Sequence, residues 1–235
     1  TRANRKIGLG VMGFADMLIK LGIRYDSEEA LTLGEKLMKF IEEESHKKSI
    51  EIAEERGSFP NFEKSIWKDK YPAFRNATVT TIAPTGTISI IAGCSSGIEP
   101  IFAISFIRNV LSGTRLFETN PLFEIIAKER GFYNAKILEE IARTGSVQSI
   151  EGVPDDVKRL FVTALDIAPE WHVRMQAVFQ KHTDNAVSKT VNLPQDAKVE
   201  DVKTVYDLAY KLKCKGVTIF RYGSKPEQVL YIGEV

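Results

Sequence analysis

The chain has 235 residues, of which 43% are hydrophobic and 27% charged, an ordinary composition for a globular fold of one large or two small domains. A formal net charge of +1 gives no overall attraction to nucleic acid or to an anionic membrane, and no apolar run approaches the roughly 20 residues of a membrane span. Two cysteines, Cys94 and Cys214, are too few for a disulfide framework, so a cytoplasmic location is expected.

Two helices are predicted first. Residues 7–21 are apolar on nearly every side and indicate a buried helix. Residues 8–13 match the G-x-G-x-x-G pattern of dinucleotide-binding folds, but no strand precedes them, so we interpret the glycines as packing points of a structural helix. A capping box at residues 26–29 starts a long helix that ends at Gly57. Its expected inner face is Ala30, Leu33, Leu37, Phe40, Ile41 and Ile52.

An aromatic-rich connection over residues 60–74 leads to the most informative stretch. Residues 78–82 read T-V-T-T-I and predict a buried strand, which is followed by a loop of hydroxyl residues around a glycine. Such a loop can hold phosphate through free N–H groups and hydroxyl donors, although the pattern alone is equally consistent with a turn that binds nothing. The absence of G-K-[ST] argues against a nucleotide hydrolase. The candidate loop residues are Pro84, Thr85, Gly86, Thr87 and Ile88.

The second half of the chain alternates predicted strands and helices. Strands are expected at residues 101–107, 188–191 and 217–220. Helices are expected at residues 120–131, 134–143, 155–164, 169–183 and 199–213. The last of these helices should bury Val202, Val205, Tyr206, Leu208, Ala209 and Leu212. This alternation predicts an α/β fold with mainly parallel pairing, and no linker divides residues 1–235.

Three residues just beyond the loop are candidates to face a ligand. Ser89 adds a hydroxyl donor, Cys94 lies five residues after it, and Glu99 is an isolated acid in an otherwise apolar run. The alternative for Cys94 is a small buried core residue. The alternative for Glu99 is an exposed position in a turn.

The histidines and the second cysteine suggest no further site. His46, His172 and His182 lack the spacing of metal ligands, so no metal centre is expected. His182 and Asp184 are assigned to the face of one helix. Cys214, at the predicted end of the last helix, is assigned a structural role.

Four blocks of sequence, in their order and spacing, are more specific than any one of them. They are N-R-K-I-G-L-G-V-M-G-F-A-D at residues 4–16, the loop region at 76–102 with G-I-E-P at 97–100, F-Q-K-H-T-D-N-A-V-S-K-T-V-N-L-P at 179–194, and K-C-K-G-V-T-I-F-R at 213–221. In these blocks the chain resembles the catalytic subunit of ribonucleotide reductase, and the adenosylcobalamin-dependent class in particular.

This resemblance implies that residues 1–235 are the C-terminal portion of a ten-stranded α/β barrel with outer helices. It implies that the loop from Pro84 to Ile88 holds the phosphates of the substrate. In the family, the radical cysteine and its reducing partner lie upstream of the matched blocks, and the shuttling cysteine pair lies beyond them. The chain is therefore expected to contain no catalytic residue and to be inactive alone.

The block at residues 213–221 distinguishes two classes of the family. In the iron-dependent class, a tyrosine pair on the matching strand relays a radical from a second subunit. Ile219 and Phe220 stand at these positions, and neither has a phenol that can be oxidised reversibly. The departure favours the class that makes its radical locally from adenosylcobalamin.

The expected function is reduction of ribonucleotides to deoxyribonucleotides by a thiyl radical, with this chain supplying the phosphate loop and part of the barrel. Adenosylcobalamin would be bound by the complete enzyme. The expected partners are a ribonucleoside diphosphate or triphosphate, the N-terminal portion of the same enzyme, and a second copy in a homodimer, with no nucleic acid and no membrane. Two alternatives stay open: the catalytic subunit of an iron-dependent reductase, and a non-catalytic nucleotide-binding module.

Overall fold

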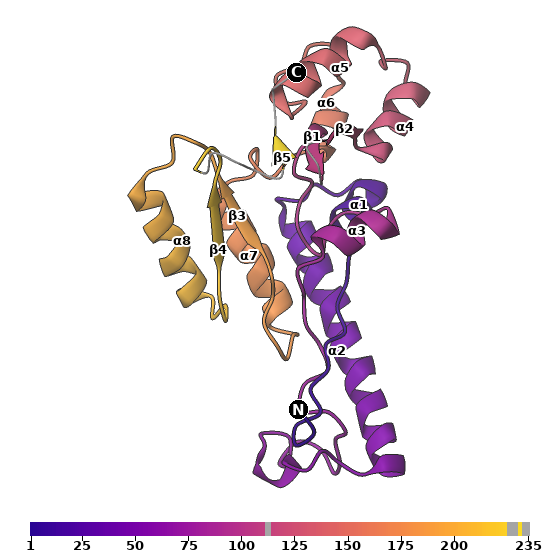
Figure 1. Cartoon of the computed structure of the whole chain (residues 1–235), viewed down its shortest axis with the longest axis vertical. Helices are drawn as coiled ribbons and strands as arrows, with labels where there is room; N and C mark the ends of the chain where they lie inside the picture. The colour runs from indigo at the N-terminus through magenta and orange to yellow at the C-terminus, as the bar shows by residue number, and fades with distance from the viewer. Residues whose placement is uncertain (111–113, 225–229, 232–235) are drawn as a thin grey trace.

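Helices and extended segments alternate in the computed structural model, which describes residues 1–110, 114–224 and 230–231 (Figure 1). The helices are α1 (Phe14–Leu21), α2 (Glu28–Arg56), the short 3-10 helix η1 (Phe62–Lys64), α3 (Gly86–Ala92), α4 (Pro121–Glu129), α5 (Ala135–Thr144), α6 (Asp155–Leu160), α7 (Pro169–Gln180) and α8 (Val199–Lys211). The strands are β1 (Ser105–Val110), β2 (Thr114–Thr119), β3 (Thr190–Leu193), β4 (Thr218–Arg221) and β5 (Leu230–Tyr231).

Four extended segments lie next to one another in a parallel row. Leu9 pairs in parallel with Thr80, and Ile82 pairs in parallel with Val187 just before β3. The strand β3 then pairs in parallel with β4. Helices fill the connections, since α2 follows the first segment, α7 precedes β3, and α8 joins β3 to β4. The predicted α/β class with parallel neighbours is therefore confirmed for this row.

The first segment of the row corrects the prediction of one helix over residues 7–21. The helix α1 covers only Phe14–Leu21, and the residues before it are extended. The Leu9 amide donates to the Val79 carbonyl at 2.7 Å, and the Thr81 amide donates to the Leu9 carbonyl at 2.9 Å. An apolar run that is first extended and then helical has no single period, so in sequence it resembles one buried helix, although Ile7 and Leu9 are each 52% exposed.

The glycines of this segment serve strand packing rather than helix packing. A Cβ on Gly10 would lie 2.2 Å from the Thr81 carbonyl oxygen, so only glycine allows the two backbones to approach this closely. Gly13 has φ of 78°, in the left-handed region, where it turns the extended chain into α1. The interpretation of these glycines as packing points within a helix was wrong.

The long helix α2 begins and ends as predicted. The Ser27 hydroxyl accepts a hydrogen bond from the Ala30 amide at 3.1 Å, which caps the N-terminus. Gly57 stands at the C-cap with a positive φ of 76°. The two signals mark a 29-residue helix that runs along most of the molecule (Figure 1).

The inner face of α2 packs against α7 at very short range. A Cβ added to Gly34 would lie 2.8 Å from the Phe179 ring, so the absence of a side chain at Gly34 lets the two helices approach closely. Phe40, which was expected on the inner face, is 63% exposed. It follows fully buried Met38 by two positions, which places it on the opposite side of the helix.

Buried apolar side chains form one large cluster and two smaller ones in the described part of the chain. The large cluster joins α1 and α2 to α4, α5, α6 and α7. A second cluster fills the aromatic-rich connection and contains Phe59, Phe62, Trp67, Phe74 and Val79. A third lies between α7, β3 and α8 and contains Val173, Val191, Leu193, Val205 and Ala209.

Most helices of the second half lie where the capping residues predict. Asn120 caps α4 and Asn134 caps α5 through their side-chain oxygens. The helix α6 is shorter than predicted and ends at Leu160. The helix α7 ends at Gln180 instead of residue 183. His182 and Asp184 therefore lie in the following turn, and their assignment to a helix face was wrong.

The helix α8 is confirmed, but its inner face is narrower than predicted. Tyr206 is 54% exposed and Leu212 is 38% exposed, whereas Val205 and Ala209 are buried. The spacing of four between the buried residues defines a single stripe, with Tyr206 just beyond it.

The predicted strands shift, and one pairing differs in direction. The strand expected at residues 101–107 is β1, which begins at Ser105 and pairs antiparallel with β2 and β5. The strand expected at residues 188–191 is β3, two residues later. The strand expected at residues 217–220 is β4, whose residues are exposed or half-buried. Among the described helices, none has both the length and the apolar character needed to cross a membrane.

Candidate functional site

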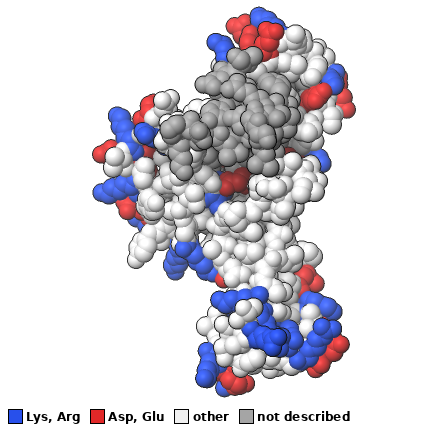
Figure 2. All heavy atoms as spheres, in the orientation of Figure 1, with Lys and Arg blue, Asp and Glu red and all other residues white. Residues whose placement is uncertain are grey.

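The candidate phosphate loop lies where an extended segment of the parallel row ends and α3 begins. Ile82, the last residue of that segment, is 1% exposed, whereas Ala83 and Pro84 are exposed. Thr85 is the N-cap of α3. In Figure 2 the area over α3 is mostly white, in keeping with the uncharged sequence from Ala83 to Ile98.

Backbone amides at the start of α3 are the strongest binding feature of this loop. Gly86, Thr87 and Ile88 are exposed, and the amides of a first helical turn have no carbonyl partner within the helix. No side chain caps α3 in the described structure. A Cβ on Gly86 would meet nothing within 4 Å, so the space beside this backbone is open. An anion here would meet several N–H donors without a cationic side chain in the loop.

The hydroxyl groups of the loop are in three different situations. Thr87 is exposed. Thr85 is only 7% exposed, and its hydroxyl lies 3.0 Å from the Ser96 hydroxyl. Ser89 is 4% exposed and donates to the Gly86 carbonyl at 3.3 Å, so its hydroxyl is directed into its own helix. Of these three, Thr87 is best placed to reach a ligand directly.

Cys94 lies behind α3, next to the start of α1. It is half-buried, and a Cβ on Gly13 would lie 3.7 Å from its sulfur. The next residue, Ser95, joins the two elements, since its amide donates to Asp16 at 2.6 Å and its hydroxyl accepts from the Asp16 amide at 3.2 Å. Cys214, also half-buried, has its pKa raised by burial, which lowers the thiolate fraction.

Glu99 is engaged in a buried ion pair that the sequence did not reveal. One carboxylate oxygen accepts from the Lys189 ammonium at 2.6 Å, and the other accepts from the Thr190 amide at 2.7 Å. The Lys189 side chain is fully buried, while the Glu99 side chain retains 24% exposure. Both carboxylate oxygens thus join the turn before Pro100 to the start of β3.

His172 completes this buried pair. Its Nδ1 accepts from the Lys189 ammonium at 2.8 Å, and its Nε2 donates to the Ala164 carbonyl at 3.0 Å. Burial, followed by the charge of Lys189, lowers the pKa of His172 to about 3. Burial also lowers the pKa of Lys189, and the charge of Glu99 opposes that shift. The neutral imidazole can therefore accept a hydrogen bond from Lys189, which a charged imidazolium could not do.

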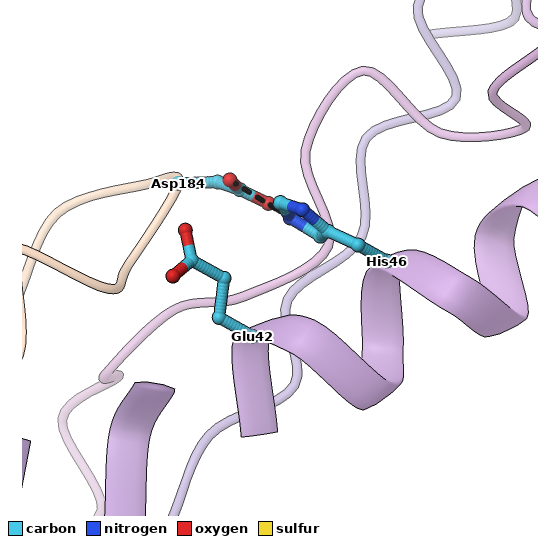
Figure 3. A group of neighbouring side chains, drawn as sticks. All are labelled: Glu42, His46 and Asp184. Atoms are coloured by element: carbon cyan, nitrogen blue, oxygen red, sulfur yellow. Dashed lines mark hydrogen bonds and ion pairs between the residues drawn. The ribbon is translucent and has the colours of Figure 1, made fainter. Parts of the chain in front are cut away.

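A second group of polar side chains gathers at the opposite end of the same extended segment. Glu42 and His46, four residues apart on α2, lie with Asp184 from the turn after α7, and their ligand-type atoms fall within 4.8 Å of one another (Figure 3). The spacing of four between Glu42 and His46 was visible in the sequence, but no sequence signal indicated that Asp184 lies beside them.

The hydrogen bonds of this group identify it as a structural junction. The Nε2 of His46 lies 3.2 Å from both oxygens of Asp184, and its Nδ1 lies 3.1 Å from the Tyr71 hydroxyl. Asp184 also accepts from the Val79 amide at 2.6 Å and from the Thr80 amide at 3.2 Å. Burial opposes ionisation of Asp184, but the bonds from His46 and from these amides lower its pKa. Both ring nitrogens of His46 already have protein partners.

The β4 positions that distinguish radical pathways are Ile219 and Phe220. Both are half-buried in the parallel pair with β3, where Ile219 lies opposite Val191 and Phe220 lies opposite Asn192. Neither side chain carries a phenol.

Comparison with known proteins agrees with this geometry. Residues 1–220 match the family model described as the ribonucleotide reductase barrel domain. A Thermoplasma acidophilum protein named vitamin B12-dependent ribonucleoside-diphosphate reductase is 55% identical over 233 residues, which cover 99% of this chain and 30% of that protein. A protein of the same name from Mycobacterium tuberculosis is 53% identical over 229 residues, which cover 97% of this chain and 33% of that protein.

A solved structure shows the same fold. The alpha subunit of the Actinobacillus ureae class Id ribonucleotide reductase matches with a TM-score of 0.80 at 26% identity, over 94% of this chain and 40% of that one. The chain spans about a third of the length of the curated relatives that it matches.

Proposed function

The chain belongs to the ribonucleotide reductase barrel-domain family, and on that basis we propose that it forms the substrate-phosphate side of an enzyme that reduces ribonucleoside diphosphates. The observation that carries this proposal is the loop from Pro84 to Ile88, with exposed residues at 86–88, open space beside Gly86, no side-chain cap on α3 and no charge. The parallel row of four segments supports its place in a ten-stranded barrel with outer helices, as a single domain over residues 1–235.

The loop would grip the diphosphate without cleaving it. Backbone N–H groups from Gly86 to Ile88 and the Thr87 hydroxyl donate to phosphate oxygens. Fixing the phosphates orients the ribose toward the reacting groups, and such positioning contributes strongly to rate. The radical and shuttle cysteines belong to other parts of the complete enzyme.

Adenosylcobalamin is the proposed cofactor of the complete enzyme, in keeping with the names of the relatives at 53–55% identity. When bound, it supplies the radical from which the reaction starts. His46 and His172 each have both ring nitrogens engaged by protein groups, so neither offers a ligand to cobalt. We assign no residue of this chain to the cofactor.

The partners follow from the same proposal. The N-terminal portion of the enzyme would complete the barrel, and two complete copies would form a homodimer in the cytoplasm. Ribonucleoside diphosphates are proposed over triphosphates because both relatives are named diphosphate reductases.

The proposal is tested by Gly86→Val in the complete enzyme. The added side chain would occupy the open space beside the backbone, so the KM for the diphosphate should rise at least tenfold, as for the loss of about 1.4 kcal/mol of binding, while cobalamin affinity stays unchanged. Gly216→Val is the matched control, because Gly216 is also open and also has no positive φ. An unaltered KM in Gly86→Val would sink the assignment.

The class is tested by turnover with adenosylcobalamin as the only radical source. We expect full activity without an iron-containing partner, and Phe220→Tyr should leave that activity largely intact because no radical passes along β4. Activity that appears only after an iron-containing subunit is added would refute the class while leaving the phosphate loop unaffected.

A further inference from the structure

The strand β3 has one apolar face and one polar face. Val191 and Leu193 are fully buried in the third cluster, between β3 and the helices α7 and α8. Because side chains alternate along a strand, Thr190 and Asn192 lie on the opposite face, where both are half-buried. Ser188 precedes them at the same spacing of two and is also half-buried. Neutral hydrogen-bonding side chains therefore follow one another along this face.

The neighbouring strand β4 widens the same face. Ile219 packs against the third cluster, so Thr218 lies on the other side of β4, where it is exposed. Thr218 is also the register partner of Thr190 in the parallel pair. The name polar face denotes Ser188, Thr190, Asn192 and Thr218.

The side chains of the polar face are free to bond a ligand. None of the four forms a hydrogen bond with any residue of the described ranges 1–110, 114–224 and 230–231. Their polar atoms are not sealed inside the protein either, because the buried side-chain atoms without a partner in these ranges belong to Arg5 and Gln176. The polar face thus offers accessible donors and acceptors that the described chain does not use.

The polar face begins beside the candidate phosphate loop. The Ser188 amide donates to the Ile82 carbonyl at 2.8 Å, at the residue where the neighbouring extended segment ends. Two residues further along β3, the Thr190 amide donates at 2.7 Å to the carboxylate of Glu99, in the turn that follows the loop and α3. Parallel strands bring their carboxyl ends to one edge, which is where α/β folds bind their ligands. The loop and the polar face therefore meet at the same edge of the parallel row.

We propose that the polar face binds the ribose of the ribonucleoside diphosphate, with the Asn192 carboxamide and the Thr190 hydroxyl as its main hydrogen-bonding groups. This rests on the proposed function of the phosphate loop and assigns the next part of the same substrate. Hydroxyls and carboxamides both donate and accept, which matches the hydroxyls of a sugar. The charge of Lys189 lies on the opposite side of β3, against His172, so the polar face itself is neutral and suits a sugar better than a phosphate.

Ligand binding to the complete enzyme, in the absence of cofactor so that no turnover occurs, tests the proposal. Asn192→Ala should raise the Kd of the ribonucleoside diphosphate about tenfold, and the isosteric Thr190→Val about fivefold, as for the loss of one or two hydrogen bonds. The Kd of the 2′,3′-dideoxyribonucleoside diphosphate, which lacks both ribose hydroxyls, should be the same in these variants as in the unaltered enzyme. Inorganic pyrophosphate should also bind equally to all of them. A dideoxy analogue that loses affinity by the same factor would overturn the ribose assignment.

Two controls separate ribose binding from a structural role. Gln195→Ala removes an exposed carboxamide just beyond β3 and should leave every Kd unchanged. Thr190→Ser keeps the hydroxyl and should retain most of the affinity that Thr190→Val loses. Denaturant unfolding of the Asn192→Ala and Thr190→Val enzymes should have the same midpoint as that of the unaltered enzyme. A lower midpoint with an unaltered Kd would show that other parts of the enzyme cover the polar face, and would overturn the proposal.

Failure of this proposal differs from failure of the phosphate loop. If Gly86→Val weakens pyrophosphate binding while Asn192→Ala leaves the Kd of the ribonucleoside diphosphate unchanged, the loop stands and the ribose assignment is wrong. If Gly86→Val leaves pyrophosphate binding unchanged, the proposed function of the loop fails. The ratio between the Kd values of the ribonucleotide and its dideoxy analogue then still decides the ribose assignment.

Discussion

The backbone amides at the two ends of the extended segment at residues 78–82 differ in whether a side chain accepts their hydrogen bonds. At the first end, the amides of Val79 and Thr80 donate to Asp184, which His46 also contacts. At the last end, the amides that follow Thr85 have no side-chain cap. The first end is a buried network of ionisable groups, whereas the second is exposed and uncharged.

The difference shows which end holds the fold together and which end is left for a ligand. Buried polar groups normally have partners, and the His46–Asp184 group meets that requirement within the protein. The loop from Pro84 to Ile88 does not, because its donors lie at the surface with open space beside Gly86. A cluster of ionisable residues can therefore be structural, and a neutral loop can be the binding site.

Removing the buried carboxylate should have the largest effect on stability. Asp184→Ala leaves His46 and the amides of Val79 and Thr80 without their acceptor, which should cost about 3–5 kcal/mol of unfolding free energy. Denaturant unfolding of the complete enzyme measures it. Asp156→Ala is the control, because Asp156 pairs with Arg130 at the surface and its loss should hardly matter. Similar losses in both variants would break the comparison.

The pH dependence of stability tests the buried contact between Lys189 and His172. His172 has its folded-state pKa lowered from 6.5 to about 3, so the unfolded chain binds more protons between these values. The contribution of neutral His172 to the unfolding free energy is complete above pH 6.5. It is lost as the pH falls toward 3, at up to about 1.4 kcal/mol per pH unit.

His172→Gln does not titrate and should lack this part of the slope, as measured by unfolding at pH 7, 6, 5 and 4. A variant with the same slope as the unaltered protein would show that His172 is already protonated in the folded state.

A side chain at Gly10, whose backbone lies against that of Thr81, should lower the unfolding free energy. Gly10→Ala places a methyl group 2.2 Å from the Thr81 carbonyl oxygen, so the two strands must separate. Overpacking of this kind costs about 1–3 kcal/mol. Unfolding measurements should show this loss, and an unchanged free energy would mean that the strands are not held this closely.

The same substitution at Gly86, which has open space beside it, should leave the stability nearly unchanged. Gly86→Ala has nothing within 4 Å of the new methyl group, so the unfolding free energy should change by no more than about 0.5 kcal/mol. Substrate affinity should nevertheless fall, because the methyl group enters the space proposed for the phosphates. A loss of stability equal to that of Gly10→Ala would remove the contrast between the two glycines.

Local signals in the sequence determined most helix boundaries and the place of the candidate loop. Ser27, Asn120 and Asn134 each cap a helix through a side chain that acts on amides two or three residues away. The loop was located by an equally local signal, since Pro84 and Gly86 follow the β-branched run at residues 78–82 directly. The matched blocks also identified the family before any contact was known.

Only the tertiary structure decided which residues distant in the sequence contact one another. Residues 7–12 became extended because Thr81 offers a backbone partner, which no periodicity within the segment records. His46 meets Asp184 across 138 positions, and Glu99 meets Lys189 across 90. Propensities and caps act over a few residues, whereas a buried charge is stable only where the fold brings its partners. For this reason the sequence located the loop, but the fold brought the Ser96 hydroxyl to 3.0 Å from that of Thr85.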